Sequence, residues 1–110
     1  FHVFDDCGKV AGYCHAHAWK QKAAYARTLE TTVYVAPDSV GRGIGETLVR
    51  ALVEECRRRG VRALVACITA GNAPSVRLHE KLGFVKVSHF RSVGEKFGRM
   101  LDVEDFELLL

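Results

Sequence analysis

The sequence predicts a mixed α/β fold in which helices pack on a mostly antiparallel sheet. Three observations carry this prediction. Strand patterns joined by short connections occupy residues 1–35, as in antiparallel hairpins. A long amphipathic pattern at 43–59 separates the strand patterns at 28–35 and 61–69, which is the order of a βαβ crossover. Alternate glycines at 41, 43 and 45 mark the change from strand to helix.

The first third of the chain predicts three strands, at 1–4, 10–18 and 28–35. Asp5-Asp6-Cys7-Gly8 is the expected hairpin turn between the first two, because Gly8 can adopt a positive φ. Residues 19–27 form a basic, aromatic connection. Side chains alternate along a strand, so the second strand has two different faces. One face carries Cys14, Ala16 and Ala18, and the other carries Tyr13, His15 and His17.

The rest of the chain predicts two helices and three strands. The helix at 43–59 has apolar residues at helical spacing and ends at Gly60. The strand at 61–69 is almost entirely apolar, which favours a central place in the sheet. The remaining elements are a helix from Pro74 to Leu82, a strand at 84–90, a glycine-containing loop at 93–98 and a last strand at 100–110.

Size and composition predict one soluble domain over residues 1–110. The net charge of +3 is too small to indicate a nucleic-acid partner, and Arg57-Arg58-Arg59 lies at a helix end, where cations are favoured. No apolar run approaches the roughly 18 residues of a membrane span, and no signal peptide is recognisable. The four cysteines form no CxxC pair. We therefore expect a cytoplasmic protein with reduced thiols and no membrane partner.

The segment Val33–Glu46 has the features of a phosphate-binding turn. An extended run stops at Pro37, and three glycines then lead into a helix whose first N–H groups are free to bind an anion. Glu46 follows Gly45 where a P-loop requires lysine, so a Walker A motif is excluded. The glycine spacing is GxGxG, and the preceding strands read as antiparallel, which argues against a dinucleotide-binding fold. A plain turn from strand to helix remains the alternative.

A metal site is not expected. His15 and His17 share a strand face, but Cys14 projects from the other face, and no third and fourth ligands are apparent.

The order of motifs after the glycine loop resembles the GCN5-related N-acetyltransferase (GNAT) superfamily. The residues that carry the resemblance are Asn72 and Leu78-His79-Glu80-Lys81-Leu82-Gly83-Phe84, at the expected distance from the loop. More narrowly, the chain resembles the phosphinothricin / methionine sulfoximine N-acetyltransferase branch, from about Val10 to the C-terminus. The further matching segments are Gly12-Tyr13-Cys14, Trp19-Lys20, Ala23-Ala24-Tyr25, Glu30, Val33-Tyr34-Val35, Pro74–Glu80, and Gly98 with Asp102.

This resemblance implies acetyl-CoA as the cosubstrate and no metal. The pyrophosphate would lie on the loop and helix start formed by Gly41, Arg42, Gly43, Ile44, Gly45 and Glu46. The edge of Val33, Tyr34 and Val35 would pair with the pantetheine amides, and Asn72 would hydrogen-bond the pantetheine arm near the thioester. The superfamily opens this loop with Gln or Arg, whereas Val40 stands there in this chain.

The resemblance also implies roles for two ionisable residues. An ammonium must lose a proton before it attacks a thioester, and Glu30 would be the general base, directly or through a water. His79 would protonate or stabilise the departing thiolate. An exposed strand glutamate and a surface helix histidine are the structural alternatives for these two residues.

The acceptor implied by the resemblance is a small amino-acid-like amine. His15, Lys20, Lys22 and Tyr25 are the candidate substrate contacts, although His15, Lys22 and Met100 each replace a residue that the branch usually carries. A protein or peptide N-acetyltransferase and a non-catalytic CoA-binding remnant are the alternatives. The family also has a strand and two helices before the position of Phe1, and its members are commonly dimers. We therefore expect a GNAT-like sheet lacking that N-terminal part, and a homodimer.

Overall fold

The computed structural model describes residues 2–6, 9–41 and 43–110, which build one six-stranded sheet and two α-helices. The strands are β1 (His2–Asp6), β2 (Lys9–Ala18), β3 (Thr28–Val35), β4 (Ala63–Thr69), β5 (Val85–Lys96) and β6 (Arg99–Leu109). The helices are α1 (Ile44–Arg58) and α2 (Ala73–Lys81), and short 3-10 turns occupy Ala23–Tyr25 and Pro37–Ser39. Within these residues, no helix has the length and apolar character that a bilayer crossing requires.

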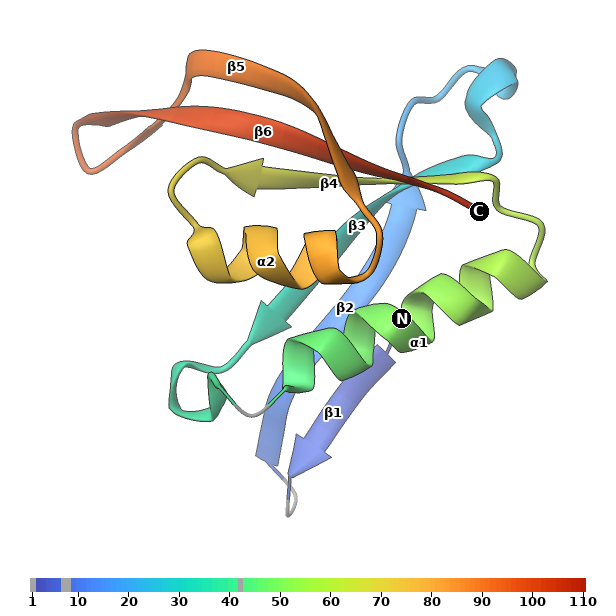
Figure 1. Cartoon of the computed structure of the whole chain (residues 1–110), viewed down its shortest axis with the longest axis horizontal. Helices are drawn as coiled ribbons and strands as arrows, with labels where there is room; N and C mark the ends of the chain where they lie inside the picture. Colours follow the sequence, from blue (N-terminus) through green and yellow to red (C-terminus); the bar gives the residue numbers. More distant parts are fainter. Residues whose placement is uncertain (1, 7–8, 42) are drawn as a thin grey trace.

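The sheet has the order β1-β2-β3-β4-β6-β5, and every neighbouring pair is antiparallel except β3 and β4. Helix α1 connects these two parallel strands, so the predicted βαβ crossover is confirmed. Both helices lie against the same face of the sheet (Figure 1). The sequence-based fold class, a mixed and mostly antiparallel sheet with flanking helices, is therefore correct.

The core lies between this sheet face and α1. The apolar stripe of α1 is buried, with Ile44, Leu48, Val49, Leu52, Val53 and Cys56 all inside. The sheet contributes Leu64, Ala66 and Ile68 of β4, Phe106 of β6, and Ala11 and Cys14 of β2 to the cluster. Because side chains alternate along β4, Val65, Cys67 and Thr69 project to the opposite face.

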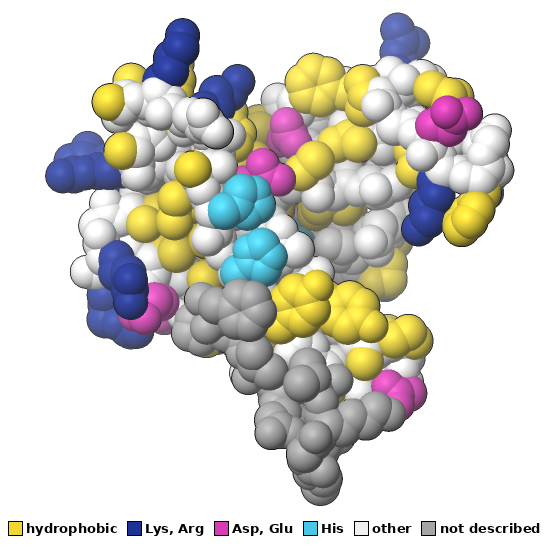
Figure 2. Space-filling view, turned by 180° about the vertical axis from the view of Figure 1, so that it is seen from behind, with side chains coloured by type: hydrophobic (Ala, Val, Ile, Leu, Met, Phe, Trp, Pro, Cys, Tyr) yellow, Lys and Arg dark blue, Asp and Glu magenta, His cyan; other side chains and the backbone are white. Residues whose placement is uncertain are grey.

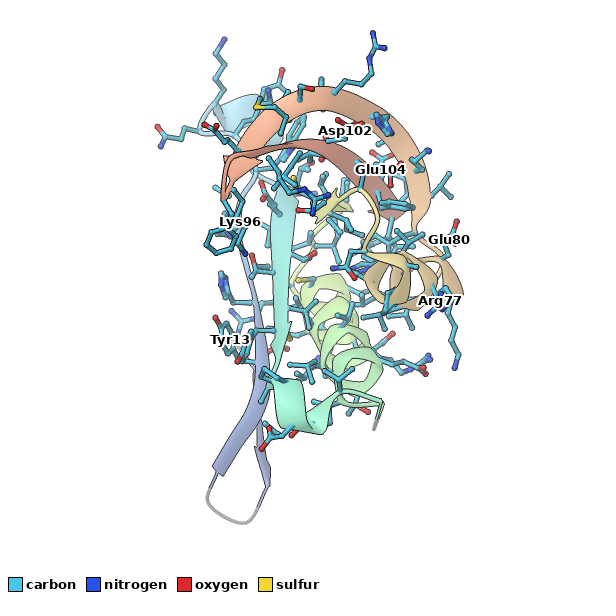
Figure 3. The ribbon with its side chains drawn as sticks, turned by 90° about the vertical axis from the view of Figure 1, so that its left-hand side faces the viewer. Tyr13, Arg77, Glu80, Lys96, Asp102 and Glu104 are labelled. Carbon is cyan, nitrogen blue, oxygen red and sulfur yellow. The ribbon has the colours of Figure 1, made fainter. Side chains whose placement is uncertain are left out.

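The face without helices carries polar and aromatic side chains. The ring of Tyr13 stacks on that of Tyr34 with centroids 5.3 Å apart, and the His15 and His17 rings follow along β2 with centroids 5.7 Å apart. Figure 3 shows Tyr13 pointing away from the helices, and Figure 2 shows histidine side chains beside acidic ones on this side of the molecule. The alternation predicted for β2 is thus confirmed.

Strands β3 and β4 separate partway along their length. They pair only where Thr28–Thr31 lies beside Ala63–Ala66. Beyond this point β3 continues along β2 as far as Val35, while β4 continues along β6 as far as Thr69. In the part of the chain that the structure describes, the edge of β3 that faces β4 therefore has no strand partner over residues 32–35.

The C-terminal hairpin differs from the sequence prediction. Residues 93–98 are not a loop, because β5 continues to Lys96 and only Phe97 and Gly98 make the turn. The pairing of β5 with β6 shifts between Phe90 and Gly94, and the Ser92 N–H in this irregular stretch donates to Asp102 Oδ1 at 2.9 Å. A strand with a bulge thus replaces the predicted loop.

The first turn also differs from the prediction. Asp5 and Asp6 belong to β1, so the predicted turn at 5–8 begins two residues too early. Its remaining residues, Cys7 and Gly8, lie outside the described part of the chain.

Candidate active site

Two adjoining cavities form a groove where β3 and β4 separate. The inner cavity has a volume of about 220 Å³ and the outer one about 310 Å³. The inner cavity is lined by Glu30, Thr31, Thr32, Val33, Ala66, Cys67, Ile68, Thr69, Asn72, Ser75 and His79. The outer cavity is lined by Val33, Val35, Val40, Gly45, Asn72, Pro74, Ser75 and Leu78. Because they share Val33, Asn72 and Ser75, the groove is continuous from the start of α1 to Glu30.

The outer end of the groove lies at the N-terminus of α1. Gly43 precedes the helix with a φ of 76°, a left-handed conformation that favours glycine, and no side chain caps the helix there. A Cβ at Gly45 would lie 3.3 Å from Leu78 Cδ2 and 3.5 Å from Val35 Cγ2, so glycine keeps this part of the groove open. Arg42, predicted to contact the cofactor, lies outside the described residues.

Glu46 links the two helices at this end. Its carboxylate binds Lys81 Nζ of α2 at 2.8 Å and Arg50 of α1 at 2.9 Å. The hydrogen bonds from Lys81 and then Arg50 lower the pKa of Glu46. The carboxylate is therefore neutralised locally, and its charge opposes an anion at the helix N-terminus less than an unpaired carboxylate would.

The predicted pantetheine edge lies along the groove. The Val33 and Val35 side chains line it, whereas the Tyr34 side chain projects to the opposite sheet face and is 44% exposed. Tyr34 can therefore contribute to the groove only through its backbone.

Asn72 serves as the N-cap of α2 and also lines both cavities. Its Oδ1 accepts a hydrogen bond from the Ser75 N–H at 3.3 Å. The side-chain amide nitrogen remains a donor, because the cap uses only the oxygen. The sequence predicted a ligand contact for Asn72, which stays a prediction, and did not predict this capping role.

His79 is buried at the inner cavity, with only 2% of its surface exposed. Its Nδ1 donates to the Ser75 carbonyl oxygen at 2.8 Å, and its ring meets Phe84 edge to face at 5.0 Å. Burial lowers the pKa of His79, an effect that the Ser75 carbonyl only partly offsets. The resting imidazole is therefore neutral, with its proton on Nδ1 and a lone pair on Nε2. It is not the surface histidine of the structural alternative.

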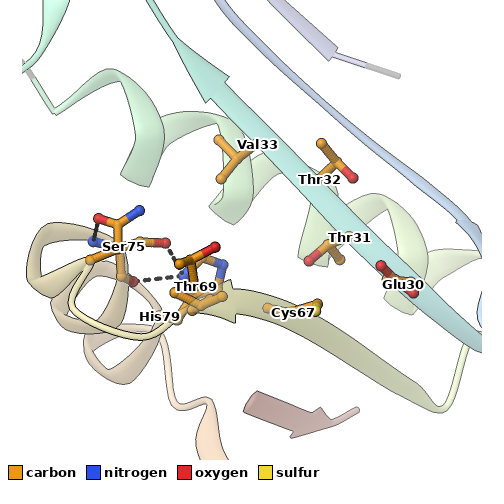
Figure 4. Close-up of a pocket in the computed structure, with 11 residues that line it drawn as sticks. Glu30, Thr31, Thr32, Val33, Cys67, Thr69, Ser75 and His79 are labelled. Atoms are coloured by element: carbon orange, nitrogen blue, oxygen red, sulfur yellow. Dashed lines mark hydrogen bonds between the residues drawn. The ribbon is translucent and has the colours of Figure 1, made fainter. Parts of the chain in front are cut away.

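Glu30 lines the inner cavity from β3, and Figure 4 shows it across the cavity from His79, with Cys67 between them. Its side chain is 34% exposed, and Oε1 lies 3.9 Å from His17 Nε2 on the neighbouring strand. The groove thus brings together the two residues that the sequence assigned to proton transfer.

The predicted substrate contacts do not line the groove. Lys20, Lys22 and Tyr25 are exposed on the connection between β2 and β3, and His15 lies on the sheet face without helices. The Tyr25 ring meets Trp19 edge to face at 5.6 Å, and Lys20 Nζ lies 4.8 Å from the Trp19 ring centre. This aromatic and basic connection directly precedes β3, in which Glu30 is the third residue.

Sequence reasoning missed seven residues that line the inner cavity: Thr31, Thr32, Ala66, Cys67, Ile68, Thr69 and Ser75. The i, i+4 spacing of Ser75 and His79 on a predicted helix could have indicated their contact. Cys67 gave no such signal, because its environment comes from other strands. Burial, the carboxylate of Asp105 and that of Glu30 raise the pKa of Cys67 to about 11, so the thiol stays protonated. Within residues 2–6, 9–41 and 43–110, no group of three or more His, Cys, Asp or Glu side chains could hold a metal ion.

Known proteins resemble this chain in sequence. An L-methionine sulfoximine/L-methionine sulfone acetyltransferase of Pseudomonas paraeruginosa is 41% identical over 106 residues, which cover 96% of this chain and 62% of the relative. The chain therefore spans about three fifths of the length of that relative.

Solved structures share the fold as well. A ribosomal-protein-alanine N-acetyltransferase from Brucella melitensis superposes with a TM-score of 0.95 at 40% identity, over 98% of this chain and 67% of that one. A GNAT superfamily phosphinothricin acetyltransferase from Sinorhizobium meliloti, in complex with acetyl-CoA, superposes with a TM-score of 0.94 at 35% identity, over 98% and 59%. The profile of the acetyltransferase (GNAT) family matches residues 1–84. This chain belongs to the acetyltransferase (GNAT) family.

Proposed function

We propose that this chain binds acetyl-CoA and transfers its acetyl group to the primary amine of a small amino-acid-like acceptor. The observation that carries the proposal is the continuous groove, which leads from the N-terminus of α1 to a cavity with Glu30 on one side and neutral His79 on the other. The names of the two relatives that act on methionine sulfoximine and phosphinothricin support this class of acceptor.

The outer part of the groove fits the cosubstrate. The N–H groups at the start of α1 favour the pyrophosphate, and glycine at 45 leaves room for it. The free edge of β3 over residues 32–35 can hydrogen-bond the pantetheine amides in the manner of an added strand. The Asn72 amide nitrogen can donate to a pantetheine carbonyl. The thioester then enters the inner cavity.

Glu30 and His79 can divide the proton transfers between them. Glu30 takes one proton from the acceptor ammonium, which frees the nitrogen lone pair to attack the thioester carbonyl. As the C–N bond forms and the C–S bond breaks, His79 Nε2 accepts the second nitrogen proton and delivers it to the departing sulfur. One proton is released through Glu30 to solvent for each acetyl group transferred. A histidine that begins neutral thus acts as an acid only after it has acted as a base.

The proposal is tested by a thiol-release assay with acetyl-CoA and L-methionine sulfoximine. We expect saturable release of CoA that depends on the acceptor. Absence of turnover, together with absence of acetyl-CoA binding in calorimetry, would overturn it.

A protein or peptide acceptor is the second candidate. The open sheet face beside Glu30, with Tyr13, His15 and His17 along β2, could receive an extended chain, and the similar Brucella protein is named for a ribosomal protein. Acetylation of peptides with free N-termini, without acetylation of free amino acids, would favour this candidate.

We also propose a homodimer in the cytoplasm. Large apolar side chains are exposed on the β5–β6 hairpin, including Val87, Phe90, Phe97 and Met100, and such exposure favours association. Cys56 and Cys67 are free thiols, as is usual in a reducing compartment. Sedimentation equilibrium tests the dimer, and a monomer at micromolar concentration would contradict it.

A further inference from the structure

Asp105 lies on the same sheet face as Glu30, one strand beyond Cys67. Glu30 is the register partner of Val65, and Cys67 is the register partner of Asp105. Val65 and Cys67 are two residues apart on β4, so these side chains project to one face. Glu30 and Asp105 therefore flank the thiol of Cys67, which lines the inner cavity. Both carboxylates disfavour ionisation of that thiol and raise its pKa.

Within the described residues, the carboxylate of Asp105 accepts hydrogen bonds from neutral donors. Ser88 Oγ donates to Oδ2 at 2.9 Å, and the Cys67 thiol also hydrogen-bonds the carboxylate. By contrast, Glu46 and Glu104 each bind a lysine. In the described part of the chain, no lysine or arginine forms an ion pair with Asp105 or lines the inner cavity. Among the described residues, neither lysine nor arginine therefore offsets the negative charge of Asp105 at this end of the groove.

The buried His79 indicates independently that a polar ligand belongs in the same cavity. Its side chain is almost fully buried, and no residue in the described part of the chain hydrogen-bonds its Nε2. A buried acceptor without a partner is unfavourable unless a ligand or water supplies a donor.

We propose that Asp105 selects acceptors whose far end, opposite the amine that Glu30 receives, is a hydrogen-bond donor without negative charge. This inference rests on the proposed function and adds a specificity-determining residue to it. A carboxylate only accepts hydrogen bonds, so it favours an N–H group and repels an anion.

Three acceptors of similar size distinguish the preference for an N–H donor from the repulsion of an anion. Methionine sulfoximine ends in a neutral group with an N–H donor, methionine sulfone ends in oxygens that only accept, and phosphinothricin ends in an anionic phosphinate. We expect kcat/KM to fall in that order, with about tenfold between the first and the last, since one unit charge a few ångströms away at a half-exposed site has about that effect.

The variant Asp105→Asn removes the charge and adds a donor while keeping an oxygen for Ser88. It should bring the three kcat/KM values to within a few-fold of one another, mainly by improving phosphinothricin. Glu80→Gln is the matched control, because it removes one negative charge on the outer side of α2, away from the sheet (Figure 3). It should leave the order unchanged. An unchanged order in Asp105→Asn would overturn the inference.

A second measurement does not depend on turnover. Cys67 is exposed, so its labelling rates by a cationic trimethylammonium-ethyl and an anionic sulfonato-ethyl methanethiosulfonate can be compared by peptide mass spectrometry. We expect the cationic reagent to be faster by about tenfold, and Asp105→Asn to reduce the ratio several-fold. The ratio cancels any change in thiol reactivity itself. A ratio near one, or one that Asp105→Asn leaves unchanged, would overturn the inference. If no acceptor is acetylated while the ratio behaves as expected, the proposed function fails and the charge selection stands.

Discussion

The imidazole of His79 donates from Nδ1 to the backbone carbonyl of Ser75, 2.8 Å away and one helical turn earlier in α2. This bond fixes the tautomer, and burial keeps the ring neutral by lowering its pKa. The remaining nitrogen, Nε2, is the atom available for proton transfer.

Replacement of His79 should therefore affect turnover more than binding. His79→Gln should lower kcat about 100-fold, a typical loss for a proton-transfer residue, with little change in the KM for acetyl-CoA. Ser75→Ala is a suitable comparison, because it keeps the backbone carbonyl that orients the ring and should cost much less. Thiol release measures both variants, and equal losses would contradict the role of His79.

The pKa of His79 should lie below the ordinary value for histidine, and the pKa of His89 should lie above it. Burial lowers the pKa of His79, whereas hydrogen bonds to Asp102 and then Glu104 raise that of His89. Proton NMR of the ring Cε1 hydrogens should show His79 titrating below pH 6.5 and His89 above it. The variants His79→Gln and His89→Gln assign the signals, and the reverse order would contradict both environments.

His89 should make the stability of the β5–β6 hairpin depend on pH. Its Nε2 lies 2.9 Å from Asp102, and its Nδ1 lies 3.0 Å from Glu104. Because its pKa is raised on folding, its stabilising contribution is complete below about pH 6.5 and is lost as the pH rises through the raised value. The pKa values of Asp102 and Glu104 are lowered, so their contributions are lost instead as the pH falls through the lowered values.

Urea unfolding tests whether the stabilising contribution of His89 decreases as the pH rises. The difference in unfolding free energy between the wild type and His89→Gln should shrink as the pH rises from 6 to 9. A difference that is constant across this range would show that the charge on His89 does not contribute.

Gly12 should be intolerant of any side chain. A Cβ there would lie 2.6 Å from the Tyr34 carbonyl oxygen and 3.2 Å from both Ile44 Cγ2 and Leu48 Cδ1. Gly12→Ala should therefore lower the unfolding free energy by about 2 kcal/mol, as overpacking in a rigid core does. Gly71→Ala is a comparison, because its Cβ would meet no atom within 4 Å and only its φ of 93° opposes the change. Equal losses in chemical denaturation would contradict the close approach at Gly12.

The sequence predicted most of the fold because its signals are local. The apolar stripe of α1, the alternation along β2 and the break at Asn72 each lie within one element. The prediction of a loop at 93–98 was wrong because the conformation of this segment depends on residues distant in the sequence. Gly94 lies opposite Leu101 in a hairpin, and Asp102 holds the bulge at Ser92. Local glycine content cannot reveal either contact.

The residues of the candidate site also fall into two groups: those that local motifs could predict and those that only contacts between distant strands bring together. Glu30, Asn72 and His79 could be named from motif order, and the groove contains all three. Cys67 and Asp105 could not be named, because only the register of β4 against β6 places them together. Lys20, Lys22 and Tyr25 lie on an exposed connection and do not line the groove. Their contact with the acceptor therefore stays a prediction.

The central claim is that Glu30 acts on an acceptor beside acetyl-CoA bound in the groove, and Glu30→Gln tests it most directly. Calorimetry and thiol release on the same preparation should show acetyl-CoA affinity within about twofold of the wild type, with turnover lowered about 100-fold. Wild-type turnover in Glu30→Gln would contradict the claim, and so would a wild-type protein that fails to bind acetyl-CoA.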